Sequence, residues 1–289
     1  AKHVKQYYKS PVQTSASIVR GATGADGVDM EGKVVVVTGA NSGLGKELAT
    51  YAAAKGATLY MLCRSPDRAE AAMKEIQELT NNDNISILLA DVGELSQVRR
   101  VVKELQAKES KIDCLICNAG VLLNDRKETS EGHEMTFASH FLGGSYLLSQ
   151  LLLPQLKAAK ESRVVFVTSG GMLITKFPDW ETVTSTGKQK ESYDGNFAYG
   201  YAKRGQVLLA ERLTVDEPSV KWVTAHPGWA GTAAVDDAFG ENKKYLEPLR
   251  STWEGAEGIG WLMAAQAASI DSGALYLDRK TQKKHIAGA

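Results

Sequence analysis

The sequence predicts one α/β domain built on a doubly wound, mainly parallel sheet of seven strands with helices on both faces. Short apolar runs rich in β-branched residues alternate along the chain with longer charged, amphipathic segments. A glycine-rich turn joins the first apolar run to the first amphipathic segment. The chain has 289 residues, 43% of them hydrophobic, and we find no internal repeat or linker that would divide it.

The expected elements alternate from residue 34 onward. Residues 34–37 are all valine, which is typical of a strand that is covered on both faces of a parallel sheet. Further strands are expected at residues 58–63, 85–89, 114–117, 164–168, 221–225 and 274–277. Helices are expected at residues 43–55, 66–80, 96–108, 133–157, 197–216 and 253–266. Repeated strand–helix units of this kind form a doubly wound sheet.

Composition narrows the class of partner. The 34 Lys and Arg residues balance the 34 Asp and Glu residues, so no net field attracts a nucleic-acid backbone. No apolar run reaches the roughly 18 residues that cross a bilayer, and the longest apolar region, residues 141–153, is interrupted by Gly, Ser and Gln. We expect a soluble, cytoplasmic protein that acts on a small molecule, without nucleic acid, metal or a transmembrane segment. Organelle or peripheral membrane association and homo-oligomer formation stay open.

The sequence also indicates the character of two further segments. Residues 1–30 are predicted to form a polar arm that lies over the surface or is partly disordered, outside the domain of residues 31–289. Cys114 and Cys117 form a CxxC pattern, which in other settings indicates a redox or zinc site. Here they belong to an expected strand, where residues three apart point to opposite faces, so the two thiols should not meet.

The glycine-rich turn indicates a nucleotide site. Gly39 permits a tight turn, Gly43 lets the backbone approach a pyrophosphate, and Gly45 allows close packing, while the helix N-terminus offers free N–H groups. The spacing Gly-x-x-x-Gly-x-Gly differs from the Gly-x-Gly-x-x-Gly form, so a simple turn or a mononucleotide site stays open. The strand–loop–helix context favours Rossmann-type dinucleotide binding by the loop residues Gly39, Asn41, Ser42, Gly43, Leu44 and Gly45.

The residue at the end of the second strand predicts which nicotinamide cofactor binds. An acidic residue there would hold a ribose 2′-hydroxyl, but this chain has Arg64. A guanidinium pairs with a 2′-phosphate and leaves no carboxylate to repel it, so we predict NADP(H) in preference to NAD(H). Lys46 or Arg68 would assist. The alternative is that Arg64 is only a surface charge.

Tyr199 and Lys203 form the most informative pair in the chain. Their spacing of four residues places them on one face of an expected helix, and a phenol beside a cation is a usable proton donor near neutral pH. The alternative for an isolated pair is an exposed amphipathic face. Tyr201 is the rival phenol, but it is only two residues from Lys203 and lies on a different face.

Five motifs in this order resemble the short-chain dehydrogenase/reductase (SDR) superfamily over residues 31–280. They are Thr38-Gly39-x3-Gly43-x-Gly45, Asn118-Ala119-Gly120, Ser169, Tyr199-x3-Lys203 and Pro227-Gly228-x3-Thr232. The phrases at residues 169–173, 226–230 and 278–280 are also similar to the branch called dehydrogenase/reductase SDR family member 12. The resemblance implies that residues 31–289 are an NADP-binding catalytic domain.

The resemblance assigns three residues to the chemistry. Tyr199 would donate a proton to a carbonyl oxygen in reduction or accept one from an alcohol in oxidation. Lys203 would stabilise the tyrosinate by its charge and bind the nicotinamide ribose. Ser169 would hydrogen-bond the reacting oxygen, although a turn after the strand is its alternative role. The hydride would come from the cofactor.

The same resemblance implies further cofactor contacts. Asp91 matches the adenine contact, although a turn into Gly93 would also explain it. Asn118 would steady the central sheet, and Thr232 would contact the carboxamide unless it only caps a helix. The remaining expected contacts are Val92, Ala119, Gly120, Pro227 and Gly228.

One position departs from the family pattern. His140 stands in Phe137-Ala-Ser-His-Phe-Leu-Gly143, where the family usually has an Asn that is thought to hold a proton-relay water beside the Lys. Because His donates and accepts hydrogen bonds and titrates near neutrality, we predict that His140 takes part in catalysis. A block of the relay and a purely structural role within the helix are the alternatives.

The substrate is less defined by the sequence. An apolar pocket from Met172, Leu173, Trp229 and Phe239 would favour a lipophilic aldehyde, ketone or alcohol, although these side chains could instead pack under a lid. The leading function is an NADP(H)-dependent oxidoreductase acting on a carbonyl or alcohol. The alternative is an SDR-fold sensor or scaffold that binds NADP(H) with negligible turnover, which His140 would favour.

Overall fold

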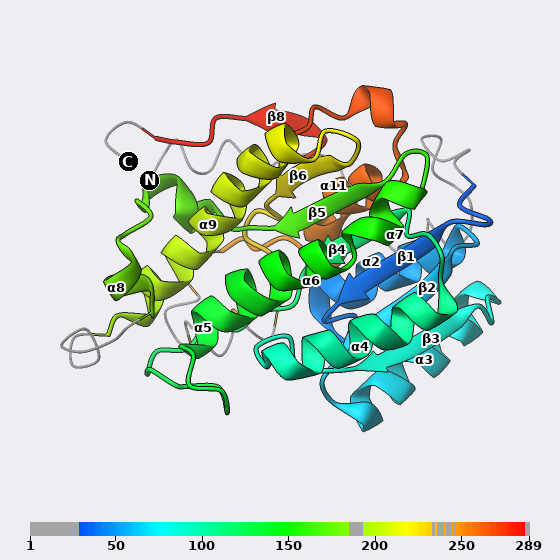
Figure 1. Ribbon diagram of the computed structural model, residues 1–289, viewed down its shortest axis with the longest axis horizontal. Helices are drawn as coiled ribbons and strands as arrows, with labels where there is room; N and C mark the ends of the chain where they lie inside the picture. The colour runs from blue at the N-terminus through cyan, green and yellow to red at the C-terminus, as the bar shows by residue number, and fades with distance from the viewer. Residues whose placement is uncertain are drawn as a thin grey trace.

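Eight strands form one sheet in the computed structural model of the chain, with β3-β2-β1-β4-β5-β6-β7-β8 as the strand order (Figure 1). The structure describes residues 29–184, 193–232 and 247–286, together with positions 235, 240 and 244. All neighbours pair in parallel except β7 and β8, which are antiparallel. The strands are β1 Val34–Thr38, β2 Thr58–Cys63, β3 Ile85–Leu89, β4 Cys114–Cys117, β5 Arg163–Val167, β6 Lys221–Ala225, β7 Leu275–Leu277 and β8 Lys280–Gln282.

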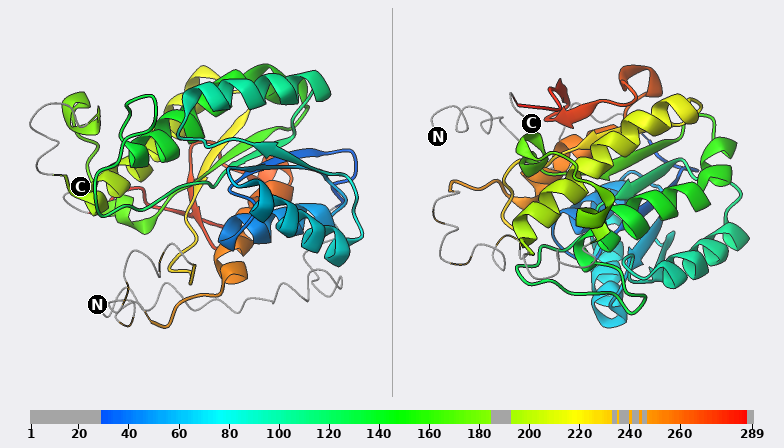
Figure 2. Two further views of the ribbon diagram at one scale, coloured as in Figure 1. Left: turned by 90° about the horizontal axis from the view of Figure 1, so that it is seen from below. Right: turned by 60° about the vertical axis from the view of Figure 1, so that its left-hand side comes forward.

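Helices cover both faces of the sheet, and Figure 2 shows the two layers from the side. One core packs Val35 and Val37 of β1 against α2, α3 and α11, and the other packs Val34 and Val36 against α4, α6 and α9. The helices are α2 Gly43–Ala54, α3 Pro66–Thr80, α4 Leu95–Lys108, α5 Met135–Phe137, η2 Ala138–Leu147, α6 Leu148–Leu151, α7 Leu153–Ala158, η3 Gly170–Ile174, α8 Trp180–Thr184, α9 Gly195–Asp216, α11 Thr252–Ala264 and η6 Ala267–Ser269. The predicted fold class is therefore confirmed.

The predicted count of seven strands is wrong, because β8 adds an eighth at the edge. Asp278 and Arg279 join β7 to β8 and both have positive φ, 50° and 64°. A two-residue turn of this kind usually carries Asn-Gly or Asp-Gly, so an Asp-Arg pair gives a weak hairpin signal. The turn is held from outside, since Arg250 donates to both carboxylate oxygens of Asp278 at 2.7 and 2.6 Å.

The single helix predicted at residues 133–157 is also wrong. It divides into α5, the π-helix η2, α6 and α7, and Pro154 stands in the first turn of α7. Gly143 in η2 lies close to the loop that follows β3, because an added Cβ would be 2.0 Å from the Val92 carbonyl oxygen. Apolar spacing along the sequence does not distinguish the wider π turn from an ordinary helix.

The CxxC interpretation is confirmed. Cys114 packs in the core with α2 and α11, whereas Cys117 packs in the core with α4 and α9, so the two thiols face opposite sides of the sheet. Both are free and buried. Of the predicted arm, residues 1–28 lie outside the described residues, and Met30 is buried in the first core. Among the helices in the described ranges, none has the length and apolar character needed to span a bilayer.

Asp278→Asn tests the contribution of the Asp278–Arg250 ion pair, here called the clamp, to the stability of the hairpin. The side chain of Arg250 is 5% exposed and that of Asp278 is 25% exposed, and loss of the carboxylate leaves a buried guanidinium without its counter-charge. Asn tolerates the positive φ, so the turn itself is preserved. We expect the free energy of unfolding, measured by urea denaturation, to fall by about 2 kcal/mol. Asp216→Asn, which removes the exposed pair with Arg212, should change it by less than about 0.5 kcal/mol. Equal effects of the two variants would contradict the clamp.

Candidate active site

A cavity of about 640 Å³ opens at the carboxyl ends of the strands. It lies where β1 separates β2 from β4, the point at which the strand order reverses and at which ligands bind in doubly wound sheets. Its volume is within the range of small-molecule and cofactor sites. With the exception of Lys46, the residues predicted for the cofactor or for catalysis line it, namely Gly39, Asn41, Ser42, Gly43, Leu44, Gly45, Arg64, Arg68, Asp91, Val92, Asn118, Ala119, Gly120, His140, Ser169, Tyr199, Lys203, Pro227, Gly228 and Thr232.

The glycine loop has the shape that a dinucleotide requires. Gly39 and Gly43 have φ of 67° and 52°, a region that favours glycine. At Gly45 an added Cβ would lie 2.1 Å from the Gly39 carbonyl oxygen, so α2 packs directly on the loop. The side chain of Ser42 makes no capping hydrogen bond, and the first turn of α2 therefore has N–H groups for a pyrophosphate. The residues present fit a bound dinucleotide.

Asn118 joins β4 to β1 at the floor of the cavity. Its Nδ2 donates to the Thr38 carbonyl oxygen at 3.0 Å, while its own backbone N–H and that of Ala119 donate to Thr38 Oγ1 at 2.9 and 2.8 Å. Thr38 Oγ1 in turn donates to the Ile116 carbonyl oxygen at 3.3 Å. These bonds satisfy the backbone where the two strands end and set the position of the glycine loop above them.

Two arginines line one side of the cavity, Arg64 directly after β2 and Arg68 in the first turn of α3. Arg64 is largely exposed, and its Nη1 is 3.7 Å from Asp91 Oδ2. Arg68 also lines the cavity, but Lys46 does not, because its Nζ pairs with Glu75 at 2.5 Å. The suggested assistance from Lys46 is therefore not supported by the geometry, whereas that from Arg68 is.

The carboxyl group of Asp91 bonds to the backbone and also lines the cavity. Its Oδ1 accepts a hydrogen bond from the Gly93 N–H at 2.9 Å, which is the turn that its sequence context also suggested. The same carboxyl group faces Arg64 and lines the cavity. The turn is therefore observed, and the adenine contact stays a prediction.

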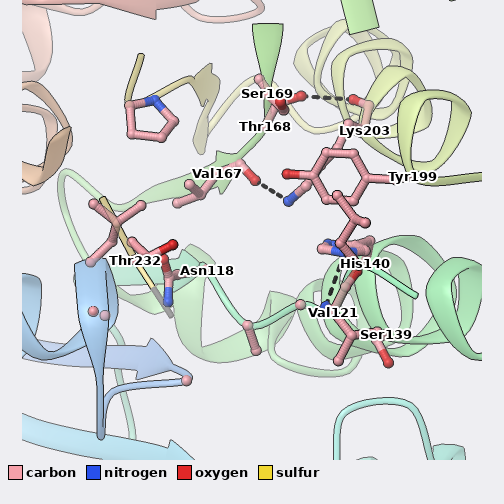
Figure 3. Close-up of a pocket in the computed structure, with 18 of the residues that line it drawn as sticks. Asn118, Val121, Ser139, His140, Val167, Thr168, Ser169, Tyr199, Lys203 and Thr232 are labelled. Atoms are coloured by element: carbon pink, nitrogen blue, oxygen red, sulfur yellow. Dashed lines mark hydrogen bonds between the residues drawn. The ribbon is translucent and has the colours of Figure 1, made fainter. Parts of the chain in front are cut away.

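Ser169, Tyr199 and Lys203 meet on the wall opposite the glycine loop (Figure 3). Ser169 lies between β5 and η3, as the N-cap residue of η3, while the other two stand on one face of α9, whose first turn is capped by Asp194. Lys203 Nζ donates to the Val167 carbonyl oxygen at 2.6 Å and lies 5.6 Å from the centroid of the Tyr199 ring. Tyr201 faces away into an aromatic cluster with Phe177 and Phe197 and does not line the cavity.

Burial controls the protonation of this group. Burial lowers the pKa of Lys203 to about 7 and raises the pKa of Tyr199, with a hydrogen bond from Ser169 acting in the opposite direction on the phenol. The charge of Lys203 is not among the causes of the shift at Tyr199, and the role of Tyr199 as proton donor stays a prediction. Tyr199 holds its proton at neutral pH and can donate it.

His140 lies directly beside Tyr199 (Figure 3). The two rings meet edge to face with their centroids 5.1 Å apart, and His140 Nε2 is 2.7 Å from the Val121 carbonyl oxygen and 3.1 Å from its N–H. Burial and the charge of Lys203 lower the pKa of His140 well below its ordinary value. The premise that this residue titrates near neutrality is thus wrong, because the imidazole is neutral there; a part in the relay stays a prediction.

The apolar side of the cavity differs from the expected one. Trp229 lines it as predicted, but Met172 and Leu173 do not. In the 3₁₀ turn of η3, residues three apart share a face, so Gly171 and Ile174 face the cavity and Met172 packs under α9. Phe239 lies outside the described residues. Among the apolar lining residues that the sequence did not indicate are Val121, Leu122, Ile174, Phe197 and Val235.

A doubly wound sheet with a glycine loop facing a Ser, Tyr and Lys group defines the class of dinucleotide-dependent oxidoreductases. A family model described as short chain dehydrogenase matches residues 33–177. Human "Dehydrogenase/reductase SDR family member 12" is 36% identical over 261 residues, which cover 90% of this chain and 80% of that protein. Bovine "Retinol dehydrogenase 12" is 32% identical over 260 residues, 88% of this chain and 80% of that protein.

The chain therefore belongs to the short-chain dehydrogenase/reductase family, and it is similar to the family member 12 branch. Its fold matches the crystal structure of L-sorbose reductase from Gluconobacter frateurii, solved with NADPH and L-sorbose, with a TM-score of 0.69 at 20% identity over 86% of this chain and 95% of that chain. The family resemblance stated from the motifs is confirmed, and with it membership of a family of oxidoreductases.

Gly45→Ala tests the fit of the glycine loop. The added Cβ would meet the Gly39 carbonyl oxygen at 2.1 Å and Asn118 Nδ2 at 2.6 Å, so the loop must move. Such overpacking costs about 1–3 kcal/mol, and we expect the affinity for nicotinamide nucleotide to fall by about tenfold or more in fluorescence titrations. Gly260→Ala, whose Cβ would have only ordinary contacts from 3.4 Å in α11, should bind as the unchanged protein does. Unaltered affinity in Gly45→Ala would show that the loop does not hold the nucleotide.

Proposed function

We propose that this chain is an NADP(H)-dependent oxidoreductase that transfers a hydride between the nicotinamide and the carbonyl or alcohol group of a lipophilic substrate. The observation that carries the proposal is the convergence of Ser169, Tyr199 and Lys203 on one wall of the cavity that the glycine loop borders. This arrangement leaves room for a dinucleotide and a substrate between the two walls.

Each of the three residues has a distinct task in the proposed mechanism. Tyr199 gives its proton to the substrate carbonyl oxygen, or takes one from an alcohol in the reverse direction. Ser169 donates a hydrogen bond to the same oxygen and fixes its position. Lys203 holds the ribose and, when charged, favours the tyrosinate that proton donation leaves. When bound, the nicotinamide cofactor supplies or takes up the hydride.

The protonation of the site supports donation of a proton at neutral pH. Burial raises the pKa of Tyr199, so the phenol carries the proton that a carbonyl needs. Because burial lowers the pKa of Lys203 to about 7, its side chain can both hold and release a proton near neutral pH.

The preference for NADP(H) rests on Arg64 and Arg68. Both line the cavity at the end of β2, where a 2′-phosphate would lie, and Ser65 adjoins them. Asp91 is the carboxylate among the described lining residues, and it lies beside Arg64 at 3.7 Å. Two guanidinium groups against one carboxylate favour an additional phosphate.

The preference for a lipophilic substrate rests on the mouth of the cavity. Ile174 is 72% exposed and Phe197 is 43% exposed, and both line the cavity together with Val121, Leu122 and Trp229. Exposed apolar side chains around a pocket favour a ligand that covers them. Similarity to proteins named retinol dehydrogenase supports a long apolar alcohol or aldehyde.

Tyr199→Phe tests the proposed acid. It should lower kcat by about 100-fold or more, because the proton donor is lost while the ring is kept. The assay follows NADPH absorbance with a retinoid aldehyde, a long-chain aliphatic aldehyde and a ketosteroid. Tyr201→Phe is the matched control on the same helix and should keep most of its activity, since Tyr201 lies outside the cavity. NADPH binding without any Tyr199-dependent turnover would instead favour a sensor.

Arg64→Ala tests the cofactor preference. Loss of one charge-assisted contact with the 2′-phosphate should weaken NADPH binding by about tenfold and leave NADH binding nearly unchanged. Fluorescence titration with both nucleotides measures the two affinities. Lys46→Ala is the control, because Lys46 pairs with Glu75 away from the cavity. The proposal fails if the unchanged protein binds NADH at least as tightly as NADPH.

A further inference from the structure

The carbonyl oxygen of His140 accepts hydrogen bonds from two buried side chains. Ser145 Oγ donates to it at 2.6 Å, five residues further along the π turn of η2, and Gln206 Nε2 donates to it at 3.0 Å. Gln206 Nε2 also donates to Ser145 Oγ at 2.9 Å, so the three groups form one closed network. Gln206 is 1% exposed and Ser145 is fully buried.

Gln206 comes from the same helix face as the proposed acid. Tyr199, Lys203 and Gln206 are separated by four and three residues on α9 and therefore form one stripe. The first two line the cavity, whereas Gln206 lies one turn deeper and does not. The stripe therefore extends from the two residues at the cavity to the backbone turn that contains His140.

We propose that Gln206 is a positioning residue, whose amide holds the π turn of η2 so that the His140 ring stands edge-on against Tyr199. The kinetic part of this inference rests on the proposed function, but the positioning itself does not. A carbonyl oxygen accepts two hydrogen bonds, and both are taken here by protein donors. A relay water at this residue therefore has no acceptor in the backbone carbonyl, and the ring itself is what η2 presents to Tyr199.

Two buried atoms without hydrogen-bond partners also indicate that Gln206 positions His140 and does not only fill space in the core. Gln206 Oε1 and His140 Nδ1 are buried with no hydrogen-bond partner among the described residues. A methionine at position 206 would fill the same volume without a buried unpaired acceptor. The amide contributes what an apolar side chain cannot, namely two donors aimed at η2.

Gln206→Met is the direct test, with Thr214→Val as the control. Thr214 donates to the Ala210 carbonyl oxygen further along α9, away from the cavity. The first readout is the ¹⁵N spectrum of the imidazole groups of the five histidines in the protein without ligand, with His140 assigned by its absence in His140→Phe. We expect Gln206→Met to shift or broaden the His140 signals and Thr214→Val to leave them unchanged. Unchanged His140 signals in Gln206→Met overturn the inference.

Turnover provides the second readout. Gln206→Met should lower kcat on the order of 10-fold, with the affinity for NADPH unchanged because Gln206 does not touch the cavity. In a His140→Phe background the same change should cause no further loss, since Gln206 acts through His140. A full additional loss there overturns the inference.

Two outcomes separate this inference from the proposed function. If neither the unchanged protein nor any variant turns over the substrates, the proposed function fails. A shift of the His140 signals in Gln206→Met would even then support the positioning of His140 by Gln206. If Gln206→Met does not fold, Ser145→Ala removes the other donor to the same carbonyl oxygen and should produce the same shift. An unaltered His140 spectrum in folded Ser145→Ala overturns the inference.

Discussion

The hydrogen bonds around Thr38 are the constraint on which the rest of the site depends. β1 and β4 are adjacent in the sheet but 80 residues apart at this point in the chain, and Thr38 is fully buried between them. Its hydroxyl and carbonyl satisfy Asn118 and Ala119, so both strands end at the same level. The glycine loop starts there, and α2 can pack on it because Gly45 has no Cβ to meet the Gly39 carbonyl oxygen. The position of the cofactor cavity follows from this junction.

The opposite wall depends on α9. Its stripe combines a phenol, a cation and an amide, and the same burial that makes these groups rigid also changes their protonation. Removal from water disfavours charge on both Tyr199 and Lys203, which raises the pKa of the phenol and lowers that of the ammonium, so that their ordinary order is reversed. The site is therefore closer to neutral than its composition suggests. A neutral phenol and a neutral His140 form a wall that donates hydrogen bonds without presenting a fixed charge.

Much of the sheet could be predicted from the sequence, because buried parallel strands are short apolar runs with sharp ends. Residues 58–63, 85–89, 114–117 and 221–225 are strands with the predicted bounds. The hairpin at Asp278 was missed because its turn is stabilised by Arg250 from another part of the chain. The π turn of η2, where the His140 carbonyl oxygen accepts hydrogen bonds from Ser145 and Gln206, was missed because apolar spacing does not distinguish it from an ordinary helix. In each case the deciding contact is distant or does not follow the usual helical period.

By itself, the sequence determined the fold class, the family and the positions of the motifs, since strand period, glycine spacing and the Tyr199–Lys203 interval are local properties of the chain. Only the tertiary structure decided which side chains face the cavity. In η3, for example, Ile174 lines the cavity, whereas the predicted Met172 packs in the core. It also decided the protonation of Tyr199, Lys203 and His140. The physical reason is that burial, and with it the cost of a charge, arises only when distant elements pack together.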